Sequence, residues 1–215
     1  MTEAQRPVQF DFGQLISDSW RIFSSNAGPL LGGVVITAII VAVGNGMAMV
    51  VGSLLMGPLT LGLFKMARDA SRGGKADFVD LFFGFREKFI HAFVANLLIS
   101  IFTAVGFILC IVPGILVSIL YMLTYLFLLE TNLDFWGAME ASRKKVMEDF
   151  GQWLLLGLLL MALNLVGSIP CGLGLLVTAP MTLVALTLAY DQAVLGAAPP
   201  ATAADVPPPP PTDQV

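Results

Sequence analysis

The chain alternates between short charged segments and long runs without charge. Neither Leu30–Phe64 nor Phe150–Tyr190 contains Asp, Glu, Lys, Arg or His, and Phe89–Leu129 contains only His91. A helix rises ~1.5 Å per residue, so crossing a hydrocarbon core ~30 Å thick takes about 20 residues. Each run is long enough for two helices and a tight turn. The pattern therefore predicts an all-α integral membrane protein with six transmembrane helices arranged as three hairpins.

Glycine and proline mark the turns and bends of these hairpins. The candidates for the first turn are Gly44, Asn45, Gly46 and Gly52, the second turn contains Pro113 with Gly114, and the third contains Pro170 to Gly174. Pro58 and Pro180 fall inside the returning helices of the first and third hairpins. Proline removes a backbone hydrogen bond there, so we expect both helices to kink.

A charged, amphipathic segment precedes each hairpin and begins at Asp11, Asp77 or Asp134, each able to cap a helix. Apolar side chains recur at helical spacing in all three segments. They are Phe12, Leu15, Ile16 and Phe23, then Phe78, Leu81, Phe82, Phe85 and Phe89, then Trp136, Met139, Val146, Met147 and Phe150. We expect three cytoplasmic helices that lie in the headgroup boundary or pack on the ends of the membrane helices.

The three units resemble one another in sequence. A shift of 123 residues places Asp11 on Asp134, Gly28 on Gly151 and Gly44 on Gly167, and one gap then places Pro58 on Pro180. The ordered matches predict a three-fold internal repeat with units at about 11–70, 77–131 and 134–191. The middle copy has diverged, because it lacks the proline within its returning helix.

The repeat forms one membrane domain between two polar ends. We expect a polar arm over residues 1–9, the six-helix domain over 10–193, and a disordered or polyproline tail over 194–215. The tail contains the run Pro207–Pro211. It is either solvated or a docking peptide for an aromatic-lined groove on a protein partner.

Composition and charge narrow the class further. Of the 215 residues 57% are hydrophobic and only 12% are charged, and the net charge is -4. This describes a multi-pass membrane protein without the basic surface that nucleic acid requires. All 11 Lys and Arg residues lie before the first hairpin, between residues 65 and 88, or at 143–145. Because cationic loops stay inside, we expect both termini in the cytoplasm. We also expect no cleavable signal peptide.

Several residues are candidates for a specific role. Asn96, Ser100 and Thr103 lie on one side of the third predicted span and Asn164 lies in the fifth, where they either line a polar path or join helices by hydrogen bonds. Cys110 and Cys171 fall at the outer ends of hairpins, where they are either bridged or two buried thiols. His91 is the only histidine, and no nucleophile, phosphate or dinucleotide motif is present. We predict no catalytic, cofactor-binding or metal-binding residue, and no enzyme activity.

Short motifs throughout the chain resemble one family. They are Gly57-Pro58, Asp80-Leu81-Phe82 with Phe85, Ile111 to Gly114, Ala138 to Ser142, and Gly172 to Gly174 with Pro180 and Tyr190. Together they are similar to bacterial six-helix membrane domains, mostly of unknown function. One branch of that family precedes the catalytic domain of glycerophosphoryl diester phosphodiesterases. The resemblance covers about residues 10–192 and implies a bacterial multi-pass membrane protein without the phosphodiesterase active site. We expect the protein in the cell (inner) membrane.

These observations leave two classes of function. A non-enzymatic scaffold or assembly factor would use the bilayer, the amphipathic helices and the proline-rich tail to hold a protein partner. A transporter or channel for a small or lipidic solute would use the repeated hairpins as its symmetry. A continuous polar cavity through Asn96 and Asn164 would favour the transporter, and a dry, closed bundle the scaffold. The sequence predicts no oligomeric state.

Overall fold

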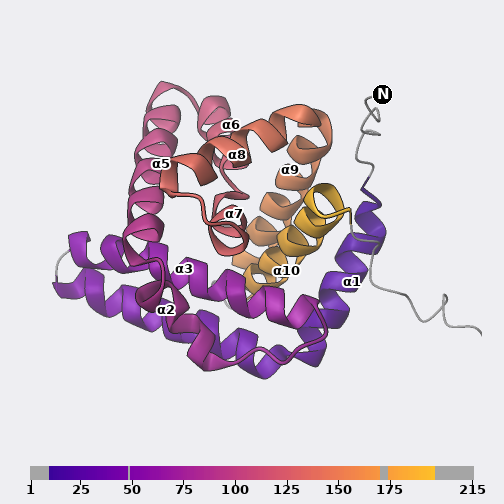
Figure 1. The fold of residues 1–215 in the computed structure, drawn as a ribbon, viewed down its shortest axis with the longest axis horizontal. Helices are drawn as coiled ribbons and strands as arrows, with labels where there is room; N and C mark the ends of the chain where they lie inside the picture. The colour runs from indigo at the N-terminus through magenta and orange to yellow at the C-terminus, as the bar shows by residue number, and fades with distance from the viewer. Residues whose placement is uncertain (1–9, 48, 170–173, 197–215) are drawn as a thin grey trace, which may run out of the picture.

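The computed structural model describes residues 10–47, 49–169 and 174–196, and within these ranges the chain contains helices and no strand (Figure 1). The elements are α1 (Phe12–Ser25), α2 (Ala27–Met47), α3 (Met49–Ser71), the 3-10 helix η1 (Phe78–Phe82), α4 (Phe83–Arg86), α5 (Phe89–Leu109), α6 (Ile111–Leu120), α7 (Thr124–Glu130), α8 (Phe135–Glu148), α9 (Phe150–Ser168) and α10 (Leu175–Val194). The predicted arm 1–9, most of the third turn and most of the proline-rich tail lie outside the described residues.

Five stretches of the described chain are long and apolar enough to cross a membrane. They are Ala27–Gly44, Phe89–Leu109, Ile111–Glu130, Phe150–Ser168 and Leu175–Val194. The predicted all-α membrane class is therefore confirmed at this coarser level. α3, expected as the second of six spans, is not among the five.

The helices of the three hairpins contact one another in a ring. α2 packs with α3, α5 with α6, and α9 with α10, while α3 also packs on α5, α6 on α9, and α10 on α2. α1 lies mainly against α10, η1 and α4 lie against α3, and α8 packs most closely on α7. Each amphipathic segment thus contacts the returning helix of another hairpin, and Figure 1 shows this for α1, which lies beside α10.

The two ends of the bundle differ in character. The charged end, which carries Arg68, Glu130 and Asp191, also holds the most deeply buried large side chains, including Trp153 and Tyr190. The apolar end exposes aliphatic side chains instead, and Ile108 and Ile169 are 84% and 77% exposed. Exposed aliphatic groups at one end and a dense core at the other suit a bundle that is partly surrounded by lipid.

The aspartates at the starts of the amphipathic segments act as helix caps, as predicted. Asp11 accepts a hydrogen bond from the backbone N–H of Gln14 at 3.0 Å, and Asp134 accepts one from that of Gly137 at 2.8 Å. Asp77 accepts from the N–H of Val79 at 3.0 Å. All three caps use a carboxylate to satisfy a backbone donor at a helix start.

The second amphipathic segment differs from the continuous helix that its spacing predicts. It forms η1 followed by the single turn of α4, because its backbone lies directly on the backbone of α3. A Cβ atom on Gly62 would lie only 2.0 Å from the carbonyl oxygen of Leu81, and one on Gly84 only 2.3 Å from that of Pro58. The close approach depends on these glycines.

The fourth predicted span is also not continuous. It breaks at Tyr121–Leu123 between α6 and α7, and Ser142 of α8 satisfies the backbone groups exposed there. The Ser142 hydroxyl donates to the carbonyl of Leu120 at 2.8 Å and accepts from the N–H of Leu123 at 3.3 Å. By contrast, α3 and α10 continue as helices through Pro58 and Pro180.

Burial in the first and third segments follows their amphipathic pattern only in part. In α1 the charged Asp18 is buried as well, and its carboxylate lies 3.1 Å from Arg21. In α8, Met139 and Val146 are buried, while Trp136 and Met147 are 57% and 55% exposed. The exposed stripe of α8 is therefore partly apolar.

Replacing Gly62 with Ala tests the close approach of α3 to η1. We expect Gly62→Ala to lower the free energy of unfolding by about 1–3 kcal/mol, because the added methyl meets backbone that cannot rotate away. Gly151→Ala is the matched control, since a Cβ there meets nothing within 4 Å. Thermal unfolding in mild detergent measures both. Equal melting temperatures for the two variants would contradict the packing described.

Candidate functional site

A buried ion cluster joins the three returning helices at the charged end. Arg68 of α3 is only 2% exposed, and its Nε lies 2.5 Å from a carboxylate oxygen of Glu130 at the end of α7. Its Nη2 lies 3.1 Å from the carboxylate of Asp191 in α10. The guanidinium also lies 5.5 Å from the centre of the Tyr190 ring, within cation–π range. One side chain thus connects helices from all three hairpins.

The cluster is balanced in charge. Arg72, which is half exposed, lies 3.3 Å from the second oxygen of Glu130, so two cations face two carboxylates. The Arg68 nitrogens are within ion-pair distance of their partners but are not aligned with them as hydrogen bonds. Burying charges in this way is tolerable only while the partners remain, because an uncompensated charge in the interior is strongly destabilising.

Two lysines join neighbouring segments to the helices that carry the cluster. The ammonium of Lys88 donates to the carbonyls of Leu128 and Thr131 at 2.5 and 2.6 Å and so caps the end of α7. Burial lowers the pKa of Lys88. Lys65 lies 2.7 Å from Asp69 and 2.9 Å from Asp80, which fastens η1 to α3. The charged end is therefore cross-linked by several ion pairs and charge-assisted hydrogen bonds.

The structure separates the four residues predicted to form a polar interior. Asn96 accepts a hydrogen bond from the Tyr125 hydroxyl at 2.9 Å, which joins α5 to α7. Ser100 is exposed and Thr103 is half-buried on α5. Asn164 bonds instead to threonines of α10. Asn96 and Asn164 thus belong to two different helix pairs.

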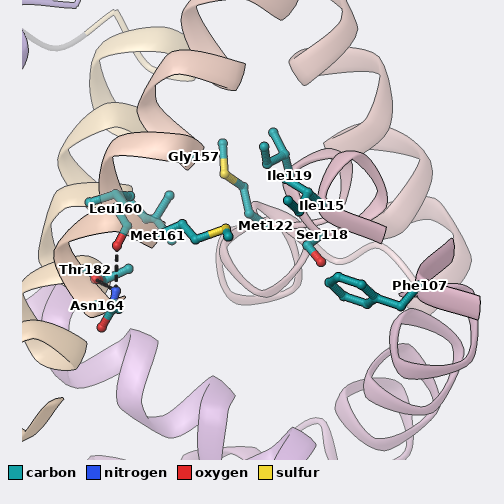
Figure 2. A pocket seen from close by; sticks show the side chains of 11 residues that line it. Phe107, Ile115, Ser118, Ile119, Met122, Gly157, Leu160, Met161, Asn164 and Thr182 are labelled. Atoms are coloured by element: carbon teal, nitrogen blue, oxygen red, sulfur yellow. Dashed lines mark hydrogen bonds between the residues drawn. The ribbon is translucent and has the colours of Figure 1, made fainter. Parts of the chain in front are cut away.

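Asn164 lies beside a groove between α6 and α9, which Figure 2 shows from close by. The groove has a volume of about 260 Å³, and its lining residues are Phe107, Ile115, Ser118, Ile119, Met122, Gly157, Leu160, Met161, Asn164, Thr182 and Leu186. A second hollow of about 520 Å³ lies along the single hairpin of α5 and α6 and includes Ile101, Phe102 and Pro113.

The polar atoms along the α6–α9 groove already have partners. The Asn164 amide nitrogen donates to the Thr182 hydroxyl at 2.7 Å and to the Leu160 carbonyl at 2.8 Å. Thr182 donates to the carbonyl of Thr178 at 2.8 Å, and Ser118 donates to that of Gly114 at 2.9 Å. The groove therefore offers apolar walls and no side-chain donor that is still unpaired.

The other candidates have no part in this arrangement. Cys110 is exposed between α5 and α6, and Cys171 lies outside the described residues. His91 is half-buried, with its ring 6.4 Å from that of Phe135. Among the residues that the structure describes, no group of three His, Cys, Asp or Glu side chains could hold a metal ion.

Comparison of the chain with protein-family models, curated proteins and solved structures finds no match. The resemblance to the membrane domain of glycerophosphoryl diester phosphodiesterases stays a prediction from the sequence.

The Arg68 cluster is the feature that sequence reasoning missed. Arg68, Glu130 and Asp191 each lie near the end of a returning helix, where a charged residue taken by itself indicates only that the helix leaves the membrane. One feature of the sequence could have revealed the cluster. Arg68 is positive, whereas Glu130 and Asp191, at equivalent places in the other two units, are negative. Opposite charges at corresponding helix ends indicate a contact between the units.

Replacing the buried Arg68 should destabilise the domain much more than replacing the half-exposed Arg72. We expect Arg68→Gln to lower the free energy of unfolding by about 3–5 kcal/mol, since it leaves the carboxylates of Asp191 and Glu130, whose side chains are 15% and 22% exposed, without their main partner. Arg72→Gln removes a half-exposed ion pair and should lower it by less than about 1 kcal/mol. Urea unfolding in detergent micelles, followed by tryptophan fluorescence, measures both variants.

A charge-free version of the cluster provides the control. The triple variant Arg68→Met, Glu130→Leu, Asp191→Leu leaves no buried charge unpaired, because Arg72, which loses Glu130, is half exposed. We therefore expect it to regain most of the stability that Arg68→Gln loses. If the triple variant were as unstable as Arg68→Gln, the charge balance would not be the cause.

Proposed function

We propose that this chain is a non-enzymatic scaffold or assembly factor of a bacterial inner membrane. In this proposal it spans the bilayer six times, with both termini in the cytoplasm, and presents its amphipathic segments to a protein partner at that face. The observation that carries the proposal is the closed charged end, where Arg68 joins all three returning helices. A bundle whose helices are joined at one end by ion pairs suits a rigid platform for a partner better than a path for solutes.

The sixth span in this proposal is α3. Its residues from Met49 to Phe64 carry no charge, and Lys65, Arg68 and Asp69 follow at its end, as expected where a helix leaves the membrane. α3 pairs with α2 as α6 pairs with α5 and α10 with α9.

The same packing order supports a three-fold repeat with a diverged middle copy. Each amphipathic segment lies against the returning helix of the preceding unit around the ring: α1 on α10, η1 and α4 on α3, and α8 on α7. The middle unit departs twice, in the 3-10 helix η1 and in the break between α6 and α7.

Exposed aromatic residues on the amphipathic segments support binding at the cytoplasmic face. Trp20 of α1 is 52% exposed, and on α8 the exposed Trp136 and Met147 lie near Arg143 and Lys144. Arg143 forms two hydrogen bonds with Glu140, which hold the pKa of that carboxyl at about 2. An exposed tryptophan on a partly apolar, charged helix face is typical of protein and membrane interfaces.

The second candidate is a transporter or channel for a lipidic solute, and the α6–α9 groove favours it. The polar side chains of the spans argue for the scaffold, because Asn96 and Asn164 are hydrogen-bonded between neighbouring helices.

Cross-linking from α8 tests the scaffold. A photoreactive amino acid at Trp136 or Met147 should capture one defined polypeptide in living cells, whereas the same group at Ile108, which is 84% exposed at the apolar end, should not. Mass spectrometry identifies the captured chain. Capture from neither α8 position, together with flux of a lipidic solute in proteoliposomes, would replace the scaffold by the transporter.

Cysteine accessibility tests the topology separately. In a chain with Cys110 and Cys171 changed to Ser, Lys144→Cys should react with an impermeant maleimide only after the membrane is opened. Ile169→Cys, at the apolar end, should react in intact spheroplasts. Reaction of Lys144→Cys from outside would reverse the proposed orientation.

A further inference from the structure

The α6–α9 groove lies along the boundary between the second and third hairpins, which we call the seam. It is built by α5 and α6 from one side and by α9 and α10 from the other, as Figure 2 shows. At a rise of ~1.5 Å per residue, Gly157 and Asn164 lie about 10 and 21 Å along α9 from its first residue, Phe150. In a chain that crosses the bilayer as proposed above, these two residues lie within the hydrocarbon core, and Phe107, two residues before the end of α5, lies nearer its outer border.

The chemistry of the groove selects an apolar occupant. Its side-chain hydroxyl and amide donors are satisfied within the protein, so a polar ligand would gain no new partner from them and would lose its own hydration. Met122, Met161 and Phe107 contribute flexible or aromatic surface that can adjust to an irregular apolar chain.

The groove is also continuous with the outer surface of the bundle. Phe107 and Met161, which line it, are 48% and 49% exposed. An occupant can therefore enter from the side, between α5 and α9, without passing either end. At this depth the surrounding medium consists of lipid acyl chains.

From this we infer that the α6–α9 groove binds one acyl chain of a membrane phospholipid, which fills the seam between the second and third hairpins. The inference rests on the membrane placement in the proposed function, and it adds a resident lipid to the scaffold. The hollow along α5 and α6 does not have this role, because it lies on a single hairpin and connects no second unit.

Ser118→Phe is the variant that tests the site. Ser118 is exposed, lines the groove, and bonds only to the carbonyl of Gly114 in its own helix, so the change fills the groove without breaking a contact between helices. Leu165→Phe is the matched control, because Leu165 is 65% exposed on α9 and does not line the groove.

Native mass spectrometry of the full chain, purified in mild detergent, gives the main readout. We expect one phospholipid adduct on the wild-type protein, retention of that adduct in Leu165→Phe, and at least about a ten-fold loss of occupancy in Ser118→Phe, the size of change that 1.4 kcal/mol produces. Equal occupancy in the two variants would overturn the inference. So would a polypeptide, rather than a lipid, that is lost selectively from Ser118→Phe.

A second measurement needs no variant. Phospholipid with a diazirine in its acyl chain, reconstituted with the wild-type protein, should label Met161 and Phe107 in preference to Ile101, which is similarly exposed at 46%. Labelling that follows exposure alone would overturn the site. Because maleimide accessibility at Lys144→Cys reports the topology independently, failure of the lipid site and failure of the membrane placement are distinguishable.

Discussion

A guanidinium can be buried between membrane helices only if carboxylates come with it, and this constraint shapes the charged end of the bundle. Arg68 is held between Glu130 and Asp191 and against the Tyr190 ring. Since its partners come from two other hairpins, the electrostatic requirement fixes how the three hairpins meet. The ion pairs of Lys65 and the caps of Lys88 extend the same principle to the segments around them.

Close contact between backbones is the second interaction that holds the helices together. Gly62 and Gly84 let α3 and the η1–α4 segment approach until backbone meets backbone, and Gly57 does the same against Ala92 of α5. In a lipid environment apolar side chains gain little by leaving their surroundings, so close packing of small residues is a principal source of helix association. The bundle is therefore tight around α3 and more open at the seam between α6 and α9.

The sequence predicted the features that depend on residues close together in the chain. Charge-free runs located the apolar helices, and Asp11, Asp77 and Asp134 marked the helix starts, because span length and capping depend on neighbouring residues. It did not predict the break at Tyr121–Leu123, which Ser142 stabilises from another helix, nor the pairing of Asn164 with Thr182. The Arg68 cluster was missed for the same reason, since its members are far apart in the chain and nothing local to any one of them indicates the others.

The spacing of that cluster along the chain bears on biogenesis. Residues 68, 130 and 191 leave the ribosome in that order, one with each hairpin. Arg68 is therefore synthesised before either of its partners, and Glu130 and Asp191 follow with the second and third hairpins. Until the last helix is made, Arg68 lacks the partner that α10 supplies. The charged end can therefore take the arrangement described above only after the whole domain has been synthesised.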